Sequence, residues 1–365
     1  RFAQQHLATD AVSRAHNPDY PFDVSRLMAA NGLLGITIEE ADGGQGGNLM
    51  DAVIAIETIA ASCPRSADVI QAGSFGAIRV LAEYGTPLQK EKYLRRLLSG
   101  EGVISVGMTE PEAGSAVTDL KTTATPDGDG FRINGTKVFT THAWYADVIL
   151  AYVRFGPGVS GIGSVLIDTK ADGVSFGQKS RFMSGEEWAQ SYFDNVYVPA
   201  EMVVLGEGGF KKQIAGFNVE RIGNTSRSLA LGRFAFEEAR RWALERQQFG
   251  RPLAEFQGLQ WKFADMKIKL DAAQLLLYRA ASQADSGFPS AEQTAIAKAF
   301  CNQSGFEIAN EAVQILGGMG YSDDSLVEYC MRRCRGWMIA GGSIEILKNR
   351  IAESVFERSF RQRPS

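Results

Sequence analysis

The chain has 365 residues, 45% of them hydrophobic and 22% charged, which is an ordinary globular composition for two or three packed domains. A net charge of −4 argues against broad nucleic-acid binding, but it does not exclude a local basic pocket that binds phosphate. No apolar run has the length of a membrane span and no signal peptide is visible, so we expect no membrane association. The sequence begins at Arg1 without a methionine, and it leaves open what precedes that residue.

Residues 1–105 are predicted to form an N-terminal helical domain. The runs LMDAVIAIETIAAS (49–62) and SFGAIRVLAEYG (74–85) place apolar residues every three or four positions, the spacing of amphipathic helices. Glycine, proline and aspartate separate these runs. Several short helices are therefore expected.

Residues 106–205 are predicted to form a middle, antiparallel β domain. Short β-branched runs in this zone are joined by PDGDG (126–130) and NG (134–135), both of which are turn sequences. GPGVSG (156–161) matches the G-x-G-x-x-G pattern. It lies between two strand-like segments and not before a helix, so we interpret it as a hairpin loop rather than a phosphate site.

Residues 206–365 are predicted to form a C-terminal helical bundle of four long amphipathic helices. They begin near Lys211, in LAEFQGLQ (from 253), in AEQTAIAK (from 291) and near Ser343. Just before the last helix, Gly341 and Gly342 precede Ser343, a pattern typical of a helix end followed by an N-cap.

Cysteine and histidine are too sparse for metal or triad chemistry. Four scattered cysteines form no disulfide framework, and three histidines make a His-rich metal site or a histidine-based triad improbable. We therefore expect no metal and a reducing compartment.

Chemistry is indicated most strongly by GMTEPEAGSAVTDLKTTA (107–124). This segment is expected to leave a strand and turn at Pro111. Its small residues would let backbone N–H groups and the hydroxyls of Thr109 and Ser115 approach a flat polar ligand. A plain turn without a ligand is the alternative interpretation. INGTKVFTT (133–141), ALERQQFGRPLAEFQ (243–257) and QILGGMGY (314–321) follow. In this order the four segments resemble the acyl-CoA dehydrogenase family of flavoproteins, and the resemblance covers nearly the whole chain.

The resemblance implies a mainly α fold with a central β domain: an N-terminal helical domain, a middle antiparallel β domain and a C-terminal four-helix bundle. It also implies FAD as cofactor, an acyl-CoA as substrate, electron-transferring flavoprotein as acceptor, and a homo-oligomer, usually a tetramer. We expect a location in the bacterial cytoplasm or the mitochondrial matrix, with the former favoured.

Two segments are implied to lie against the flavin within one subunit: Met108, Thr109, Gly114 and Ser115 in the first, and Phe139, Thr140 and Thr141 in the second. Phe139 replaces the usual tryptophan, so an aromatic cover remains but the indole N–H is lost. Ala116 stands where the family usually has aspartate.

Two further segments are implied to reach the FAD of a neighbouring subunit. Their residues are Arg246, Phe249, Gln257, Gln314, Gly317 and Gly318. Ser343 and Glu345 match positions on the cofactor side. A solvated helix end is the alternative interpretation of Arg246.

The usual catalytic base of the family is absent. In much of the family it is the glutamate of a Y-E-G-T segment, and Gly341 occupies that position here. In the isovaleryl- and long-chain-type branches an earlier helix carries the base, and Glu220 in GFNVERIGNTS (216–226) matches that position. An exposed helix glutamate is the alternative. Gly341 is expected to leave room that Glu220 enters, while its N–H donates to the thioester oxygen.

Other residues are implied to bind substrate. Asn218 and Arg221 match residues that contact the CoA moiety, and Ser115, Gly341 and Gly342 are also assigned to the substrate site. Arg79 lies within an apolar run. It is interpreted either as a surface arginine with a packed stem or, speculatively, as the partner of a carboxylated acyl tail.

The expected reaction is α,β-dehydrogenation of an acyl-CoA to a 2,3-enoyl-CoA, with Glu220 removing the α-proton and flavin N5 accepting the β-hydride. A flavin-containing lyase or desulfinase without net oxidation and a non-catalytic flavin-binding interaction protein are the alternatives. Acyl chain length, branching, a second carboxylate and the physiological acceptor are not readable from the sequence.

Overall fold

The computed structural model describes residues 1–284 and 288–360, which separate into two compact units. The first unit consists of Arg1–His16, Val53–Asp68 and Glu220–Ser365, and the second of Asn17–Ala52 and Val69–Val219. Three helices continue from one unit into the other: α4 (Leu49–Ala60), α5 (Ala67–Ser74) and α9 (Phe210–Glu245). No helix in the described ranges is long and apolar enough to cross a membrane.

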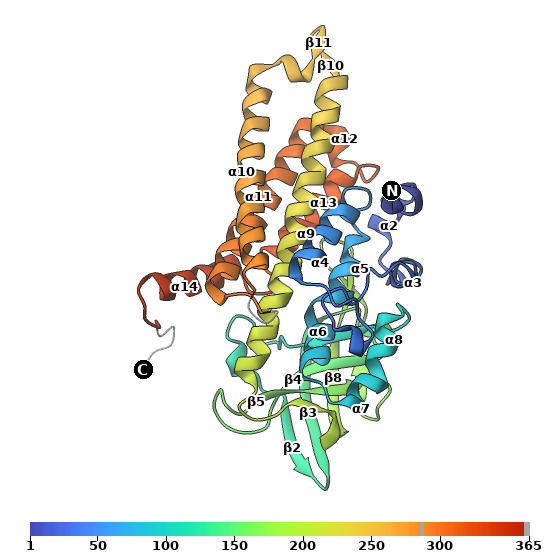
Figure 1. Cartoon of the computed structure of the whole chain (residues 1–365), viewed down its shortest axis with the longest axis vertical. Helices are drawn as coiled ribbons and strands as arrows, with labels where there is room; N and C mark the ends of the chain where they lie inside the picture. Colours follow the sequence, from blue (N-terminus) through green and yellow to red (C-terminus); the bar gives the residue numbers. More distant parts are fainter. Residues whose placement is uncertain (285–287, 361–365) are drawn as a thin grey trace. The chain divides into compact units, whose positions relative to one another are not determined.

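A largely antiparallel sheet forms the centre of the second unit (Figure 1). Its strands run in the order β6-β8-β3-β2-β4-β5-β9, with β1 parallel to β4 and β7 beside β8. Their bounds are β1 Ile104–Gly107, β2 Thr123–Asp127, β3 Gly130–Thr141, β4 Val148–Arg154, β5 Ile162–Asp168, β6 Val174–Phe176, β7 Ser180–Arg181, β8 Glu187–Pro199 and β9 Val203–Leu205. The predicted middle β domain is thus confirmed as a fold element.

The sequence explains the centre of this sheet. β4 and β5 are continuous apolar runs buried on both faces, whereas β8 alternates buried and more exposed residues as a strand with one covered face does. GPGVSG joins β4 to β5, as expected, and Arg154 Nη1 donates to Gly158 O at 2.6 Å within that loop.

The prediction of a turn at Asn134-Gly135 is wrong. Both residues lie inside β3, where the register with β8 shifts between Ile133 and Gly135 in a β-bulge. Gly135 has φ +153°, and a Cβ there would lie 2.4 Å from Thr122 Oγ1, so the glycine permits a close backbone approach.

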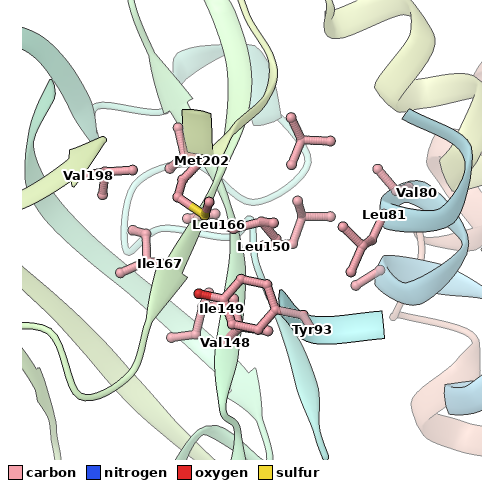
Figure 2. Close-up of a cluster of buried hydrophobic side chains, with 14 of the residues drawn as sticks. Val80, Leu81, Tyr93, Val148, Ile149, Leu150, Leu166, Ile167, Val198 and Met202 are labelled. Carbon is pink, nitrogen blue, oxygen red and sulfur yellow. The ribbon is translucent and has the colours of Figure 1, made fainter. Parts of the chain in front are cut away.

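The second unit also contains short helices: α3 Phe22–Ala30, α6 Gly76–Tyr84, α7 Pro87–Gln89 and α8 Arg95–Leu98, with a π turn at Lys90–Leu94. Of these, α6, the π turn and α8 contribute side chains to the core beneath the sheet. α7 starts with a capping box, in which Thr86 and Gln89 satisfy each other's backbone N–H groups. Figure 2 shows Val80, Leu81 and Tyr93 facing β4 and β5 in the shared apolar core, which also holds Met202 and Val198.

Long helices form the first unit. The three longest are α9, α10 (Gln257–Ser282) and α11 (Ala291–Leu316). Shorter helices follow them in the chain: α12 (Gly318–Tyr321), α13 (Leu326–Trp337) and α14 (Ile344–Val355). The N-terminus adds α1 (Phe2–His6) and α2 (Ala11–His16). α11 packs against α10, α13 and α14. The helical bundle is confirmed, with α13 as an additional helix and a 3₁₀ turn (Leu253–Glu255) before α10.

A small hairpin links α9 to α10 at their shared end (Figure 1). β10 (Gln247–Gln248) pairs with β11 (Arg251–Pro252), and the two residues between them, Phe249 and Gly250, have φ +52° and +79°. Two positive φ values are what a tight type I′ hairpin turn requires, and glycine meets this need while phenylalanine is strained.

Candidate active site

The predicted loop and the strand that follows it lie together in the second unit. Val138 N donates to Thr109 O at 2.8 Å, and Lys137 Nζ donates to Met108 O at 3.3 Å. Met108 and Thr109 are half-buried, while Gly114 and Ser115 are exposed. Two of the segments that the resemblance assigns to the flavin are therefore adjacent.

Glu110 anchors this loop from inside. Its carboxylate accepts from Lys137 Nζ at 2.7 Å, from Lys121 N at 2.5 Å and from the Thr122 backbone and hydroxyl at 3.0 and 2.6 Å. Burial raises the pKa of Glu110, but Lys137 and these hydrogen bonds outweigh it and hold the pKa below its ordinary value. Burial lowers the pKa of Lys137 to about 8, against the pull of Glu110.

Sequence reasoning missed this buried pair. Glu110 and Lys137 lie within the segments that were quoted, but nothing in a single sequence separates a buried carboxylate or lysine from an exposed one. The pair fixes the loop and β3 to each other, and the exposed hydroxyl of Ser115 follows in the same loop.

Phe139 stands out on β3. Its φ is +57° and its side chain is 53% exposed, at a second register shift of the β3–β8 pair between Lys137 and Thr140. Its ring lies 4.7 Å from Trp188 and 6.1 Å from Phe182. A strained, exposed aromatic residue supplies a flat apolar surface.

The next two residues of β3, Thr140 and Thr141, are less exposed than Phe139. Thr140 is buried, and its Oγ1 has no hydrogen-bond partner in the described part of the chain, whereas Thr141 is half-buried. A hydroxyl without a partner beside an exposed aromatic ring suits a planar ligand with polar edges, and a flavin has this chemistry.

Glu220 belongs to the first unit, on α9. It is half-buried, as is Arg221, while Asn218 on the preceding turn is buried in the second unit. Arg221 Nε donates to Gly341 O at 2.9 Å, so α9 contacts the Gly341–Gly342 turn directly. The alternative of a fully exposed glutamate is not what the structure shows.

The Gly341–Gly342 turn is left-handed and tightly surrounded. The two residues have φ +75° and +95°, beyond α13, which ends at Trp337 and not at Gly341. A Cβ on Gly341 would lie 2.6 Å from Asn224 Nδ2 and 3.3 Å from Lys298 Cε. The expectation that Gly341 leaves room for another side chain is wrong, because Asn224 and Lys298 fill that space.

Ser343 and Glu345 begin the next helix. The Ser343 hydroxyl accepts from Ile346 N at 3.4 Å as the N-cap of α14, which confirms that predicted cap. Glu345 is exposed in the first turn, where its own backbone N–H and the Ser343 hydroxyl lower the pKa of its carboxyl.

The residues implied to reach a neighbouring subunit are exposed in this chain: Arg246, Phe249, Gln257, Gln314, Gly317 and Gly318. Phe249 is 94% exposed at the tip of the β10–β11 hairpin, and Arg246 lies 5.7 Å from the ring centroid of Trp242. An exposed, strained phenylalanine is costly in a monomer, so a partner surface is its simplest use.

Arg79 is not a solvated surface arginine, since its side chain is 11% exposed. It already has an anionic partner, because Nη1 lies 2.6 Å from Glu83 Oε2 one turn along α6. The four cysteines are buried free thiols, and no group of three or more His, Cys, Asp or Glu among the described residues could hold a metal ion.

Family models match nearly the whole chain. Those described as the N-terminal, middle and C-terminal domains of acyl-CoA dehydrogenase match residues 1–101, 105–196 and 207–356. The three matches together cover most of the chain.

Curated relatives of similar length have several activities. A short-chain-specific acyl-CoA dehydrogenase of Clostridium acetobutylicum is 32% identical over 97% of this chain and 95% of its own length. A 3-sulfinopropanoyl-CoA desulfinase of Paraburkholderia xenovorans is 31% identical over 100% and 96%. A subunit of the caffeyl-CoA reductase-Etf complex of Acetobacterium woodii is 34% identical over 94% and 93%.

Among solved structures, the butyryl-CoA dehydrogenase of Megasphaera elsdenii matches with a TM-score of 0.90 at 30% identity. The match covers 97% of this chain and 95% of that one. Similarity in both sequence and fold therefore extends across the chain.

Proposed function

Because the chain belongs to the acyl-CoA dehydrogenase family, an FAD-dependent family of oxidoreductases, we propose that it removes hydrogen from Cα and Cβ of an acyl-CoA thioester. The product is a 2,3-enoyl-CoA. Bound FAD supplies a two-electron acceptor for the hydride that leaves the β-carbon. The residues proposed to hold it are those of the loop at 108–115 and of Phe139–Thr141, whose exposed ring and partnerless hydroxyl fit its flat, polar-edged ring system.

Glu220 is the proposed base. The observation that carries this assignment is the packing of its stretch of α9 against the Gly341–Gly342 turn, through Arg221 and Asn224. A half-buried carboxylate beside that turn is suited to remove a weakly acidic α-proton. The Gly341 N–H and the loop that carries the exposed Ser115 are proposed to serve the thioester, while Asn218 and Arg221 bind CoA.

Replacing Glu220 tests the proposal. Glu220→Gln keeps the shape and removes the base, so flavin bleaching by acyl-CoA under anaerobic conditions should slow by roughly 10²–10⁴-fold. Stopped-flow absorbance with a panel of acyl-CoAs measures this. Glu237→Gln is the matched control, since Glu237 is an exposed carboxylate farther along α9 that pairs with Arg240. Equal bleaching by wild type and Glu220→Gln refutes the assignment.

A desulfinase or lyase reaction is the second candidate. Four of the curated relatives are named 3-sulfinopropanoyl-CoA desulfinase, at 31–34% identity. In that case a tail group would be released without lasting flavin reduction. The same anaerobic experiment separates the two reactions, because product analysis by mass spectrometry detects a shortened acyl-CoA.

Electron-transferring flavoprotein is the proposed acceptor. The name of the Acetobacterium woodii relative places that protein in an Etf complex, and a structural neighbour with a TM-score of 0.90 at 31% identity comes from work on the electron transferring flavoprotein of Acidaminococcus fermentans. We also propose a homo-oligomer, usually a tetramer in this family, in a bacterial cytoplasm.

A further inference from the structure

Lys298 is a buried lysine of α11 that the proposed reaction does not yet use. Its side chain is 0% exposed, and its Nζ donates to Trp337 O at 3.0 Å and to Gly342 O at 3.1 Å. Both acceptors are backbone carbonyls, one at the end of α13 and one in the turn before α14. All three residues belong to the first unit.

The surroundings of Lys298 are unfavourable for an amine. Burial and, to a smaller extent, the charge of Arg221 lower the pKa of Lys298 to about 7, while Glu220 opposes the shift. A methionine would fill a similar volume without the cost of burying an amine. A lysine at this position is therefore explained by its two acceptors and not by the packing of α11.

Basic side chains hold both carbonyl groups of the Gly341–Gly342 turn. From α9, Arg221 Nε donates to Gly341 O at 2.9 Å. From α11, Lys298 Nζ donates to Gly342 O. Glycine adopts positive and negative φ about equally readily, so a Gly-Gly pair does not fix its own conformation. Here two helices fix two successive peptide planes, with φ +75° and +95° at the two glycines.

This pair of contacts lies beside the proposed base. Arg221 directly follows Glu220 on α9, and the charge of Glu220 acts on Lys298. Lys298 Cε lies 3.3 Å from the place of a Cβ on Gly341. Loss of the Lys298 amine would therefore free the backbone of the same turn whose N–H is proposed to serve the thioester.

We propose that Lys298 is a positioning residue for the dehydrogenation: it holds the Gly342 carbonyl so that the Gly341 N–H keeps the direction in which it donates to the thioester oxygen. This inference rests on the proposed function, which assigns the thioester to that N–H. The α-proton passes to Glu220, and the electron pair of the broken C–H bond places negative charge on the oxygen as the enolate forms. A preorganised donor stabilises that charge. A misplacement of about 1 Å can cost on the order of 100-fold in rate.

A 3-thia-acyl-CoA isolates the step at which this donor acts. Sulfur replaces the β-carbon, so the probe can lose its α-proton but has no β-hydride to give. Its enolate stays beside oxidised flavin, where a charge-transfer band at long wavelength reports it. The probe carries the acyl chain that bleaches the flavin fastest in the acyl-CoA panel. A pH titration of the band in the FAD-loaded protein gives the apparent pKa of the bound probe, and isothermal titration gives its dissociation constant.

Lys298→Met should slow bleaching by the matching acyl-CoA roughly 10–100-fold and leave the dissociation constant of the probe within about threefold. The same loss of enolate stabilisation should raise the apparent pKa of the bound probe by roughly one to two pH units, since each tenfold change corresponds to one unit. Lys298→Gln keeps a neutral donor on a shorter side chain and should give intermediate values. Thermal melts show whether each variant is folded, and Lys298→Gln carries the comparison if Lys298→Met is not.

Asn302→Leu is the matched control. Asn302 Nδ2 donates to Trp337 O at 2.8 Å, the carbonyl that Lys298 also contacts at the end of α13. The replacement removes a bond at that helix end and leaves the Gly342 carbonyl held. Bleaching and the apparent pKa of the probe should therefore stay within about threefold and about half a pH unit of the wild type.

The outcomes separate this inference from the proposed reaction. Equal effects of Asn302→Leu and Lys298→Met overturn the inference, because the loss then arises from the end of α13. An unchanged rate and an unchanged apparent pKa in the folded Lys298 variants overturn it too, and so does a loss confined to the dissociation constant. A wild type that neither bleaches nor forms the band overturns the proposed function, and the inference falls with it.

Discussion

At the scale of single residues, Gly341 carries the most information. Its position is where much of the family places a catalytic glutamate, and the structure shows why no side chain fits there. Asn224 lies 2.6 Å from the place of a Cβ, Lys298 lies at 3.3 Å, and φ is +75°. Steric exclusion and backbone conformation therefore act together.

Gly341→Ala should lower the free energy of unfolding by about 1–3 kcal/mol, because the backbone must stay left-handed and Asn224 must move. Urea unfolding followed by circular dichroism measures the change. Gly336→Ala is the matched control, since Gly336 lies in α13 with nothing within 4 Å of its Cβ position. That replacement should be neutral or slightly stabilising. Equal effects of the two would contradict the crowding at Gly341.

At the scale of secondary-structure elements, Lys298 ties α11 to the turn between α13 and α14. Its Nζ donates to Trp337 O at 3.0 Å and to Gly342 O at 3.1 Å, and Asn302 Nδ2 also donates to Trp337 O, at 2.8 Å. These contacts satisfy the carbonyl group of Trp337 at the end of α13 and that of Gly342 in the turn before α14. Burial, reinforced by Arg221 and opposed by Glu220, lowers the pKa of Lys298 from 10.5 to about 7.

The depressed pKa of Lys298 predicts a specific pH dependence of stability. Between pH 7 and 10.5 the unfolded chain holds a proton on Lys298 that the folded protein has lost, so stability from this group rises with pH. The slope is at most about 1.4 kcal/mol per pH unit, and the full penalty for burying the charge applies below pH 7. Lys298→Met should remove this slope. Urea unfolding at pH 7 and 9 compares the two proteins, and parallel pH profiles would contradict the prediction.

The elements themselves were largely predictable from the sequence, because they depend on local periodicity. The sequences of α4, α6, α10 and α11 repeat apolar residues at helical spacing. Near Ile104 the pattern changes to the short β-branched runs that are typical of strands. The prediction of a turn at Asn134-Gly135 failed because the dipeptide Asn-Gly occurs both in turns and in β-bulges. Only the pairing of β3 with β8 decides between them.

The candidate site was predictable only in part. Segments such as 107–124 could be singled out, and the structure brings Thr109 next to Val138. The buried ion pair of Asp68 with Arg333 could not be found, because these residues are 265 positions apart in the chain and meet only through tertiary packing. From a single sequence, a charged residue at either position is predicted to be an exposed, solvated side chain.

At the scale of the whole molecule, exposed apolar residues predict self-association. Trp261, Ile268 and Leu275 repeat every seven residues along α10 and are 62%, 66% and 73% exposed. Such a stripe on one helix face is unfavourable in water unless another surface covers it. We propose that a second copy of the chain does so, which would also bring a neighbour's Phe249 hairpin within reach of a cofactor.

Charges on that stripe should disrupt the assembly. The double variant Ile268→Glu/Leu275→Glu is expected to shift the protein from the proposed tetramer to a smaller species and to weaken FAD retention. Light scattering after size-exclusion chromatography gives the mass, and absorbance gives the flavin content. Lys267→Gln/Asp271→Asn is the control, because it changes an exposed pair on the same helix. An unchanged mass in the stripe variant refutes the proposed interface.

The crowding around Gly341 also bears on the evolutionary history of the chain. A glutamate at that position would collide with Asn224 and Lys298, so the single substitution Gly341→Glu is not tolerated without a further change at its neighbours. Such a substitution at Gly341 is tolerated only together with substitutions at Asn224 or Lys298, a dependence that geneticists call epistasis. With the proposed base on α9, relatives that have glutamate at the position of Gly341 should carry a small residue at the position of Asn224.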